Sequence, residues 1–325
     1  MNIELFFIPL TEMDEASTSA CMALLSDDER AKVARYRAPK AQMNGLLVRA
    51  ALRCVLSQGL QSCGGSSPCS SLRQIAPQDW CFEYGAKGKP SLSHEQFLKT
   101  GIEFNLSHSG DWLLIALAQD DDSGATAKRA KPRLGLGVDI ERSRVSTNIY
   151  PILNHYFSPI EAEALLAMEG GEAQRQRFFD LWALKESYIK ATGLGLAQSL
   201  KSFAFDLAPN SLVAIDDGAL QAAETHNWVE LNPREIATPS QITLSSNSKL
   251  PSHIKLYSNI KLLIEPESVL DATTSGVQHW QSYFGRLDEE YRFGLSLMHK
   301  DRLAKVAISM QLTSMEGLLE ACSAI

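Results

Sequence analysis

Apolar and polar residues alternate along the chain in two series of segments that follow the same order. The first series predicts a strand, two helices and three further strands, at residues 3–8, 27–37, 41–57, 81–84, 103–107 and 112–118. The second predicts a strand, two helices and three strands, at residues 136–141, from 158 onward, 174–192, 201–207, 279–286 and 291–298. The repeated order predicts an α+β fold of two similar α/β halves, related by a pseudo-twofold axis and separated by a cleft.

A capping box, the sequence signature of a helix start, occurs in each half. Ser26 is followed three residues later by Glu29, and Ser158 is followed in the same way by Glu161. The long apolar-periodic run of the second half ends at Gly193, which is typical of a helix C-terminus. These signals fix where the principal helices begin and end.

The remaining segments divide the chain further. The two halves are expected at residues 1–135 and 136–299. Segments rich in small and charged residues predict inserted loops in the first half, near 58–76 and 119–133. Residues 211–276 are too long for a plain connection and predict an insertion in the second half. The tail, 300–325, has apolar residues at helical spacing and predicts a helix.

Composition narrows the class of protein. The chain has 325 residues, 45% of them hydrophobic, which is enough for about two domains. No apolar run approaches the ~20 residues of a membrane span, and the N-terminus lacks the basic start of a signal peptide. Six cysteines without a Cys-x-x-Cys spacing predict free thiols and a cytoplasmic location, although Cys63 and Cys69 leave a metal or disulfide pair open. The net charge of −7 argues against a nucleic-acid partner.

Candidate chemistry gathers on one predicted strand and one predicted helix. Asp139 and Glu141, two residues apart, point to the same face of the strand, and Glu186 and Lys190, four apart, share a face of the helix. Mg²⁺ that also binds phosphate oxygens takes only part of its ligands from the protein, and three carboxylates are suitable for that part. Lys185 and Lys190 would add positive charge for a polyphosphate. The pattern predicts a Mg²⁺-dependent reaction on a pyrophosphate or nucleotide-like substrate.

Each of these motifs also has a plain structural interpretation. An Asp-x-Glu pair alone is more often a solvated strand face than a metal site. Trp182 is more typical of a core, and Lys185 with Glu186 could be an ordinary exposed helix pair. Only the combination of the motifs favours a functional site.

In combination, four motifs resemble those of the surfactin-synthetase type of 4′-phosphopantetheinyl transferase. They are a Gly-Val-Asp-x-Glu strand, a Trp-x-x-Lys-Glu-x-x-x-Lys helix, an Asn-x-Ser-His-Ser segment and a Gly-Lys-Pro segment, at residues 137–141, 182–190, 105–109 and 88–90. The motifs follow the order of that family. The resemblance covers roughly residues 1–210 and, less clearly, 279–299.

The resemblance implies a reaction and roles for the motif residues. The phosphopantetheine arm of coenzyme A would pass to a serine of an apo acyl or peptidyl carrier protein, with release of adenosine 3′,5′-bisphosphate. Asp139, Glu141 and Glu186 would hold Mg²⁺, and Glu186 would also accept the proton of the serine. Lys185 and Lys190 would stabilise charge on the pyrophosphate.

The resemblance also implies contacts to the nucleotide end of coenzyme A. Ser107, His108 and Lys89 would line it. Lys32 and Arg35, in a basic cluster after the first capping box, are candidates for its 3′-phosphate. Related proteins have more basic residues here, and Arg49 or Arg53 could compensate. A solvated charged helix face is the alternative for any of these cations.

Two other functions remain open on the motifs. A Mg²⁺-dependent phosphohydrolase or nucleotidyl enzyme would use the same carboxylates, and a non-catalytic module could bind coenzyme A or a carrier protein. The chain is expected to act as a monomer, because both halves of one site lie within it. Which carrier protein is modified cannot be read from the motifs.

Overall fold

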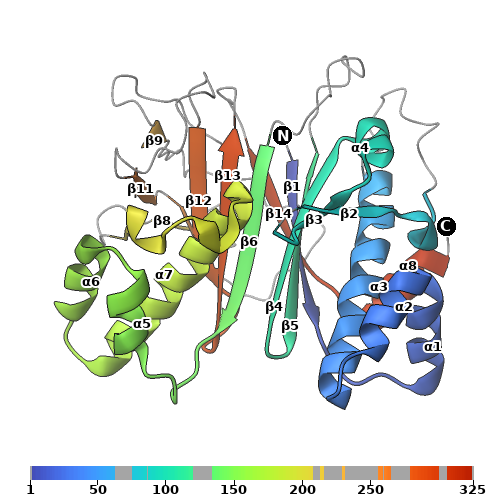
Figure 1. Cartoon of the computed structure of the whole chain (residues 1–325), viewed down its shortest axis with the longest axis horizontal. Coiled ribbons are helices and arrows are strands. Elements are labelled where there is room, and N and C mark those ends of the chain that lie inside the picture. Colours follow the sequence, from blue (N-terminus) through green and yellow to red (C-terminus); the bar gives the residue numbers. More distant parts are fainter. Residues whose placement is uncertain are drawn as a thin grey trace.

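A computed structural model describes residues 2–62, 75–85, 87–119, 134–207, 213–215, 229–230, 255–258, 260–264, 279–299 and 306–323. Within these ranges the fold is α+β, with eight α-helices and fourteen β-strands in mixed sheets. Two sheets, each flanked by helices on its outer side, lie side by side and meet at the centre of the molecule (Figure 1). None of the described helices has both the length and the apolar content that a membrane crossing requires.

The N-terminal half has a four-stranded sheet in the order β14, β1, β5, β4. Its strands are β1 (Asn2–Pro9), β4 (Ile102–Ser109), β5 (Trp112–Gln119) and β14 (Ala307–Leu312), and a hairpin adds β2 (Phe82–Tyr84) and β3 (Pro90–Leu92). Its helices are α1 (Glu15–Leu24), α2 (Asp27–Ala34), α3 (Pro39–Ser62), α4 (His94–Thr100) and α8 (Met315–Ser323). Apolar residues of α3, its neighbouring helices and one sheet face form a single core.

The C-terminal half has a six-stranded sheet in which β6, β13, β12, β10 and β8 follow one another and β9 also pairs with β12. Its strands are β6 (Leu134–Arg142), β8 (Val213–Ile215), β9 (Val229–Glu230), β10 (Lys255–Ser258), β12 (His279–Arg286) and β13 (Tyr291–His299). A separate pair consists of β7 (Phe203–Asp206) and β11 (Lys261–Ile264). Helices α5 (Ile149–Tyr156), α6 (Pro159–Leu166) and α7 (Gly171–Thr192) cover the outer face.

The inner faces of the two sheets share a core. Alternate residues of β1, such as Leu5 and Phe7, pack in one buried cluster with Val138 of β6 and Phe293 of β13. The rings of Phe7 and Phe293 meet edge to face with 4.9 Å between centroids. Because one apolar cluster joins the two sheets, the position of each half is set by the other.

The outer face of the second sheet receives α7 at very close range. A Cβ atom added at Gly137 of β6 would lie 2.0 Å from the carbonyl oxygen of Ser187, and one at Gly294 of β13 would lie 2.5 Å from that of Ala183. Real Cβ atoms do not approach backbone so closely, so only glycine permits this contact. The helix backbone therefore lies directly on the sheet, which fixes its height above the strand that carries Asp139.

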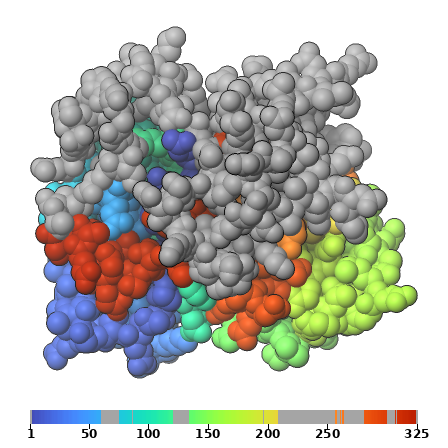
Figure 2. All heavy atoms as spheres, turned by 180° about the vertical axis from the view of Figure 1, so that it is seen from behind, coloured from blue at the N-terminus to red at the C-terminus, as the bar shows by residue number. Residues whose placement is uncertain are grey.

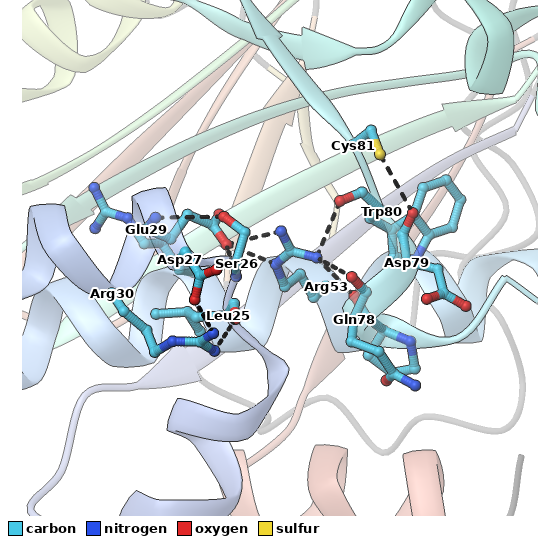
Figure 3. Close-up of polar contacts among 12 residues, drawn as sticks. Leu25, Ser26, Asp27, Glu29, Arg30, Arg53, Gln78, Asp79, Trp80 and Cys81 are labelled. Carbon is cyan, nitrogen blue, oxygen red and sulfur yellow. Dashed lines mark hydrogen bonds and ion pairs between the residues drawn. The ribbon is translucent and has the colours of Figure 1, made fainter.

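Both predicted capping boxes are confirmed. Ser26 opens α2 with Glu29 as its reciprocal partner, and Ser158 opens α6 with Glu161. The carboxylate of Glu29 also binds Arg53 of α3, with 2.7 Å between Nη2 and Oε2 (Figure 3). This ion pair is buried inside the first half.

The predicted helical tail is partly wrong. Ala307–Leu312 forms β14, which pairs in parallel with β1, and only Met315–Ser323 is helical. Ile308 and Met310 are buried at alternate positions beside the edge of β1, which is a strand pattern rather than a helical one. In the view from behind, the red C-terminal segment lies against the blue N-terminal half (Figure 2).

The predicted insertions are only partly described. Helix α3 continues to Ser62, so the loop expected from 58 begins later, and most of 58–76 and 119–133 lies outside the described residues. Within the expected insertion 211–276, the apolar stretch 254–264 contains two short strands, β10 and β11, and the rest lies largely outside the described residues. Strand β10 extends the sheet by pairing with β12.

Candidate active site

Strand β4 presents a row of polar side chains to β6 of the other half. Ser107 Oγ donates to Asp139 Oδ1 at 2.8 Å, and Ser109 Oγ donates to Glu141 Oε2 at 3.0 Å. Asn105, at the next position in the row, accepts a hydrogen bond from a β6 backbone N–H at 2.9 Å. Alternate residues of β4 therefore hold alternate residues of β6, and the two carboxyl groups of the second half are oriented by hydroxyl groups of the first half.

Asp139 is the most enclosed acid of the site. It is 3% exposed, and its Oδ1 also accepts from Lys190 Nζ of α7 at 2.7 Å. Burial raises its pKa, and the hydrogen bonds from Lys190 and Ser107 oppose that effect. Its second oxygen, Oδ2, is buried and has no hydrogen-bond partner among the described residues. An unpartnered buried carboxylate oxygen is costly unless a further ligand binds it.

Glu141 and Glu186 lie close enough to Asp139 to feel its charge. Burial, together with the negative charges of Asp139 and Glu186, raises the pKa of Glu141 to about 7. Burial and Asp139 likewise raise the pKa of Glu186, while Lys190 lowers it. Three carboxyl groups thus converge on one ammonium group, and this excess of acid suits a divalent cation.

The described residues contain no group of three acidic, histidine or cysteine side chains already arranged around a metal. Oδ1 of Asp139 is bound by the ammonium group of Lys190. The donor chemistry therefore fits Mg²⁺, as the unpartnered Asp139 oxygen and the raised Glu141 pKa indicate, but the carboxyl groups are not preassembled as a ligand shell.

Lys185 does not lie at this site. Its side chain is fully buried, and its Nζ lies 2.8 Å from Glu161 Oε2 of α6. The same nitrogen donates to the carbonyl oxygens of Leu200 and Phe203, at 2.8 and 2.7 Å. This buried placement does not support the predicted contact with the substrate phosphates, because adjacent helix residues are rotated by about 100° and Lys185 points to another side of α7 than Glu186 does.

Two residues predicted to line the nucleotide are engaged within the protein. Lys89 Nζ donates to the carbonyl oxygens of Leu136 and Lys190, at 2.9 and 2.7 Å, so it ties the hairpin of the first half to β6 and α7. The hydroxyl of Ser107 lies between Asp139 and Lys190. Both residues therefore support the acidic site directly.

His108 is exposed beside this site and is surrounded by positive charge. Desolvation lowers its pKa, and the charges of Lys190 and Arg49 lower it further. Arg49 of α3 donates from Nη1 to the Gly45 carbonyl at 2.8 Å, and its Nε is buried without a hydrogen-bond partner in the described part of the chain. Arg49 and Lys190 therefore supply positive charge beside the carboxylates, and His108 lies close to both with a pKa that favours its neutral form.

The basic cluster of the first half divides into exposed and buried members. Lys32 lies over the ring of Tyr84, 4.1 Å from its centroid, and Arg35 is exposed at the end of α2. Arg53 is 2% exposed and is committed to Glu29 and to the carbonyl oxygens of residues 77, 78 and 80 (Figure 3). Arg53 is therefore a structural residue, whereas Arg49 remains a candidate for the additional cation.

Comparison with known proteins agrees with the geometry. Residues 135–239 match the family model described as the 4′-phosphopantetheinyl transferase superfamily. The chain is 29% identical over 232 residues to the 4′-phosphopantetheinyl transferase HetI of Nostoc sp., covering 71% of this chain and 83% of that protein. It is 28% identical over 206 residues to a putative 4′-phosphopantetheinyl transferase of Synechocystis sp., covering 63% of this chain and 70% of that protein.

A third relative matches over a shorter stretch. A 4′-phosphopantetheinyl transferase of Bacillus subtilis is 35% identical over 134 residues, which covers 41% of this chain and 49% of that protein. The matched family region begins with β6 and contains Asp139, Glu141, Glu186 and Lys190. The chain is therefore a transferase enzyme. Residues 135–239, in its second half, are similar to the 4′-phosphopantetheinyl transferase superfamily.

Proposed function

We propose that this enzyme transfers the 4′-phosphopantetheine group of coenzyme A to a serine of an apo acyl or peptidyl carrier protein and releases adenosine 3′,5′-bisphosphate. The observation that carries the proposal is the convergence of three carboxyl groups on Lys190, with one buried oxygen of Asp139 left unpartnered among the described residues. Such a site suits a cation and a pyrophosphate together, and the named relatives are enzymes of this type.

Asp139, Glu141 and Glu186 would hold Mg²⁺, which would neutralise charge on the pyrophosphate. Ser107 and Ser109 hold the first two carboxyl groups, and the three groups would complete their ligand shell only when the cation binds. Because these hydroxyl groups belong to the first half and the carboxyl groups to the second, both halves would be necessary for one metal site.

Proton transfer is assigned to Glu186. Its pKa is raised by burial and by Asp139, which brings a carboxylate closer to the range where a general base is effective near neutral pH. In this scheme Glu186 accepts the hydroxyl proton of the carrier serine, directly or through one water molecule, as the serine oxygen attacks the phosphorus of the phosphopantetheine arm.

Lys190 would stabilise the charge that develops on the departing phosphate. Its side chain is 28% exposed, so a substrate can reach it from solvent while it remains bound to Asp139. A preorganised cation of this kind typically contributes about 3 kcal/mol to transition-state stabilisation. Lys185, by contrast, has no part in binding the phosphates in this proposal.

The nucleotide end of coenzyme A would lie on the cationic side of the site. We assign its 3′-phosphate to His108 and Arg49, with Lys32 and Arg35 as the exposed cations nearest along the first half. Lys89 and Ser107 would act through their hydrogen bonds to β6 and α7.

The finer classification is also part of the proposal. The surfactin-synthetase type, with two pseudo-symmetric halves in a monomer, is supported by the recurrence of β1, β5 and β4 as β6, β13 and β12, each set joined in antiparallel order. The shared core allows one chain to complete one site. The described cysteines are free thiols, which agrees with a cytoplasmic location.

Intact-mass spectrometry of an apo carrier protein tests the function. After incubation with the enzyme, coenzyme A and Mg²⁺, the carrier should gain the mass of one phosphopantetheine group, and a carrier with Ala in place of the acceptor serine should gain none. Cleavage of coenzyme A without any mass added to the carrier would favour the phosphohydrolase. An inert mixture that still binds coenzyme A would favour the non-catalytic module.

A further inference from the structure

Lys185 occupies a closed polar niche on the side of α7 that faces away from the acidic site. Both members of the Lys185–Glu161 ion pair are 0% exposed, and Lys185 also satisfies two backbone carbonyl groups just before and within β7. Glu161 accepts from the backbone N–H of Phe205 at 2.9 Å and from the backbone N–H of Ser158 at 3.1 Å. The pair thus joins α7, the start of α6 and β7 at a single point.

The same arrangement occurs in the first half. Glu29 and Arg53 are 24 residues apart, as are Glu161 and Lys185, and each glutamate is the third residue of a capping box. In each case the cation lies on the long helix and also binds backbone carbonyl groups from a later segment. Two buried ion pairs with the same spacing and partners are a shared anchoring device.

The second anchor acts on the helix that carries the chemistry. Glu186 follows Lys185 directly, and Lys190 lies just over one turn further on. Gly137 and Gly294 set the height of α7 above the sheet, and apolar residues of the helix such as Leu184 pack in the core of the second half. Apolar contacts are non-directional, so they restrain a small rotation about the helix axis less than hydrogen bonds and ion pairs do. A buried ion pair on one flank supplies that restraint, because any rotation would separate Lys185 from three acceptors at once.

We infer that Lys185 is a positioning residue, and that its pair with Glu161 fixes the rotation of α7 so that Glu186 and Lys190 meet Asp139. The inference rests on the proposed function for its kinetic consequence. Its structural consequence, a restrained α7, does not depend on the reaction.

The test compares Lys185→Met with Arg53→Met, its counterpart in the first half. Hydrogen exchange measured by mass spectrometry reports on the two helices, calorimetry reports on coenzyme A binding, and steady-state kinetics report on transfer per folded molecule. Lys185→Met should speed exchange in α7 and lower kcat by about a hundredfold, because small misplacements of catalytic groups carry such losses. The Kd of this variant for coenzyme A should change by less than about threefold. That change is small compared with the loss of about a hundredfold in kcat, because the variant misplaces catalytic groups and does not remove a ligand of the substrate.

The matched variant separates positioning from stability. Arg53→Met should speed exchange in α3 but leave kcat at saturating substrates unchanged, since α3 carries no carboxylate of the site. Lys185→Arg should fail to restore kcat, because the niche fits an ammonium group with three acceptors. If Lys185→Met does not fold, Glu161→Gln takes its place, because it removes the ion pair but leaves Lys185 bound to the two carbonyl groups. It should show the same pattern with a smaller loss of kcat.

Three results would overturn the inference. Normal kcat in folded Lys185→Met would make the pair a stabilising contact only. If Lys185→Met weakened coenzyme A binding and Lys185→Arg restored it, Lys185 would be a ligand of the substrate phosphates. Unchanged hydrogen exchange in α7 of Lys185→Met would show that the ion pair does not restrain the helix. Failure of the wild-type enzyme to transfer would refute the proposed function, and the exchange measurement would still decide the structural claim.

Discussion

The long helices of the two halves, α3 and α7, are anchored alike but differ in the residue next to the anchor. Arg53 is followed by Cys54, which is 0% exposed in the apolar core. Lys185 is followed by Glu186, whose pKa is raised by burial and by the nearby charge of Asp139. The same scaffold therefore supports an apolar core in one half and a reactive site in the other. The two helices differ in this respect at the residue that follows the buried cation, Cys54 in α3 and Glu186 in α7.

The strands beneath the helices differ in the same way. Phe6 and Ile8 of β1 fill the core under α3. On β6 the corresponding row consists of glycines followed by Asp139 and Glu141, so α7 lies close to the strand and the acids emerge beside it. Glycines replace the bulky side chains of β1, so α7 lies closer to its sheet than α3 does to β1. Side chains of α7 and β6 can then form hydrogen bonds with each other.

The largest expected effect is on the carboxylates of the second half. Asp139→Asn and Glu186→Gln should each lower kcat by about a thousandfold, because each removes charge from the site while preserving side-chain volume. The intact-mass assay followed over time measures the loss, and circular dichroism melting checks that both variants fold. Cys54→Ala, at the matching position of α3, should retain its kcat. An equal loss of kcat in Cys54→Ala and Glu186→Gln would contradict the difference between the two helices.

The next effect concerns the close approach of α7 to the sheet. Gly137→Ala should lower the free energy of unfolding by about 2 kcal/mol, since its Cβ would collide with the Ser187 carbonyl. Urea unfolding measures the change. Gly171→Ala, at the start of the same helix with nothing within 4 Å of the added atom, is the control and should be neutral or slightly stabilising. A stable Gly137→Ala protein would show that the helix does not lie on the strand.

The smallest expected effect is the pH dependence of metal binding. In the absence of metal the pKa of Glu141 is raised to about 7, so below that pH a proton competes with the cation. The affinity for Mg²⁺ should therefore rise between pH 6 and pH 8, by at most about tenfold per pH unit below the pKa. Calorimetric titration at several pH values measures it, and Glu141→Gln should flatten the profile. An equally steep profile in that variant would assign the proton to another group.

Much of the fold can be predicted from local patterns. The strands and long helices of both halves lie within a few residues of their predicted positions, because alternation and capping boxes are local signals. The patterns do not predict helices α1, α4 and α5, and α1 in particular depends on Asp14, whose side chain accepts from the Ser17 backbone at 2.7 Å. The helix predicted over β14 is wrong because the partner of that strand, β1, is about 300 residues away.

The candidate site divides in a similar way. The convergence of Asp139, Glu141, Glu186 and Lys190 can be predicted from spacing on a strand and a helix. The alternation of polar residues along β4 indicates a role for Ser109, but its partner on β6 is not visible in the sequence. The phosphate contact predicted for Lys185 relies on its closeness to Glu186 in the sequence, but adjacent helix residues point about 100° apart, and Lys185 binds Glu161.

A crystal structure with coenzyme A and Mg²⁺ tests the central claim most directly, namely that the reactive site is built on α7 and β6 and is supported from β4. The account predicts the cation among Asp139, Glu141 and Glu186, the pyrophosphate within reach of Lys190, and Lys185 still bound to Glu161. A pyrophosphate bound to Lys185, or a cation held away from these carboxylates, would contradict it.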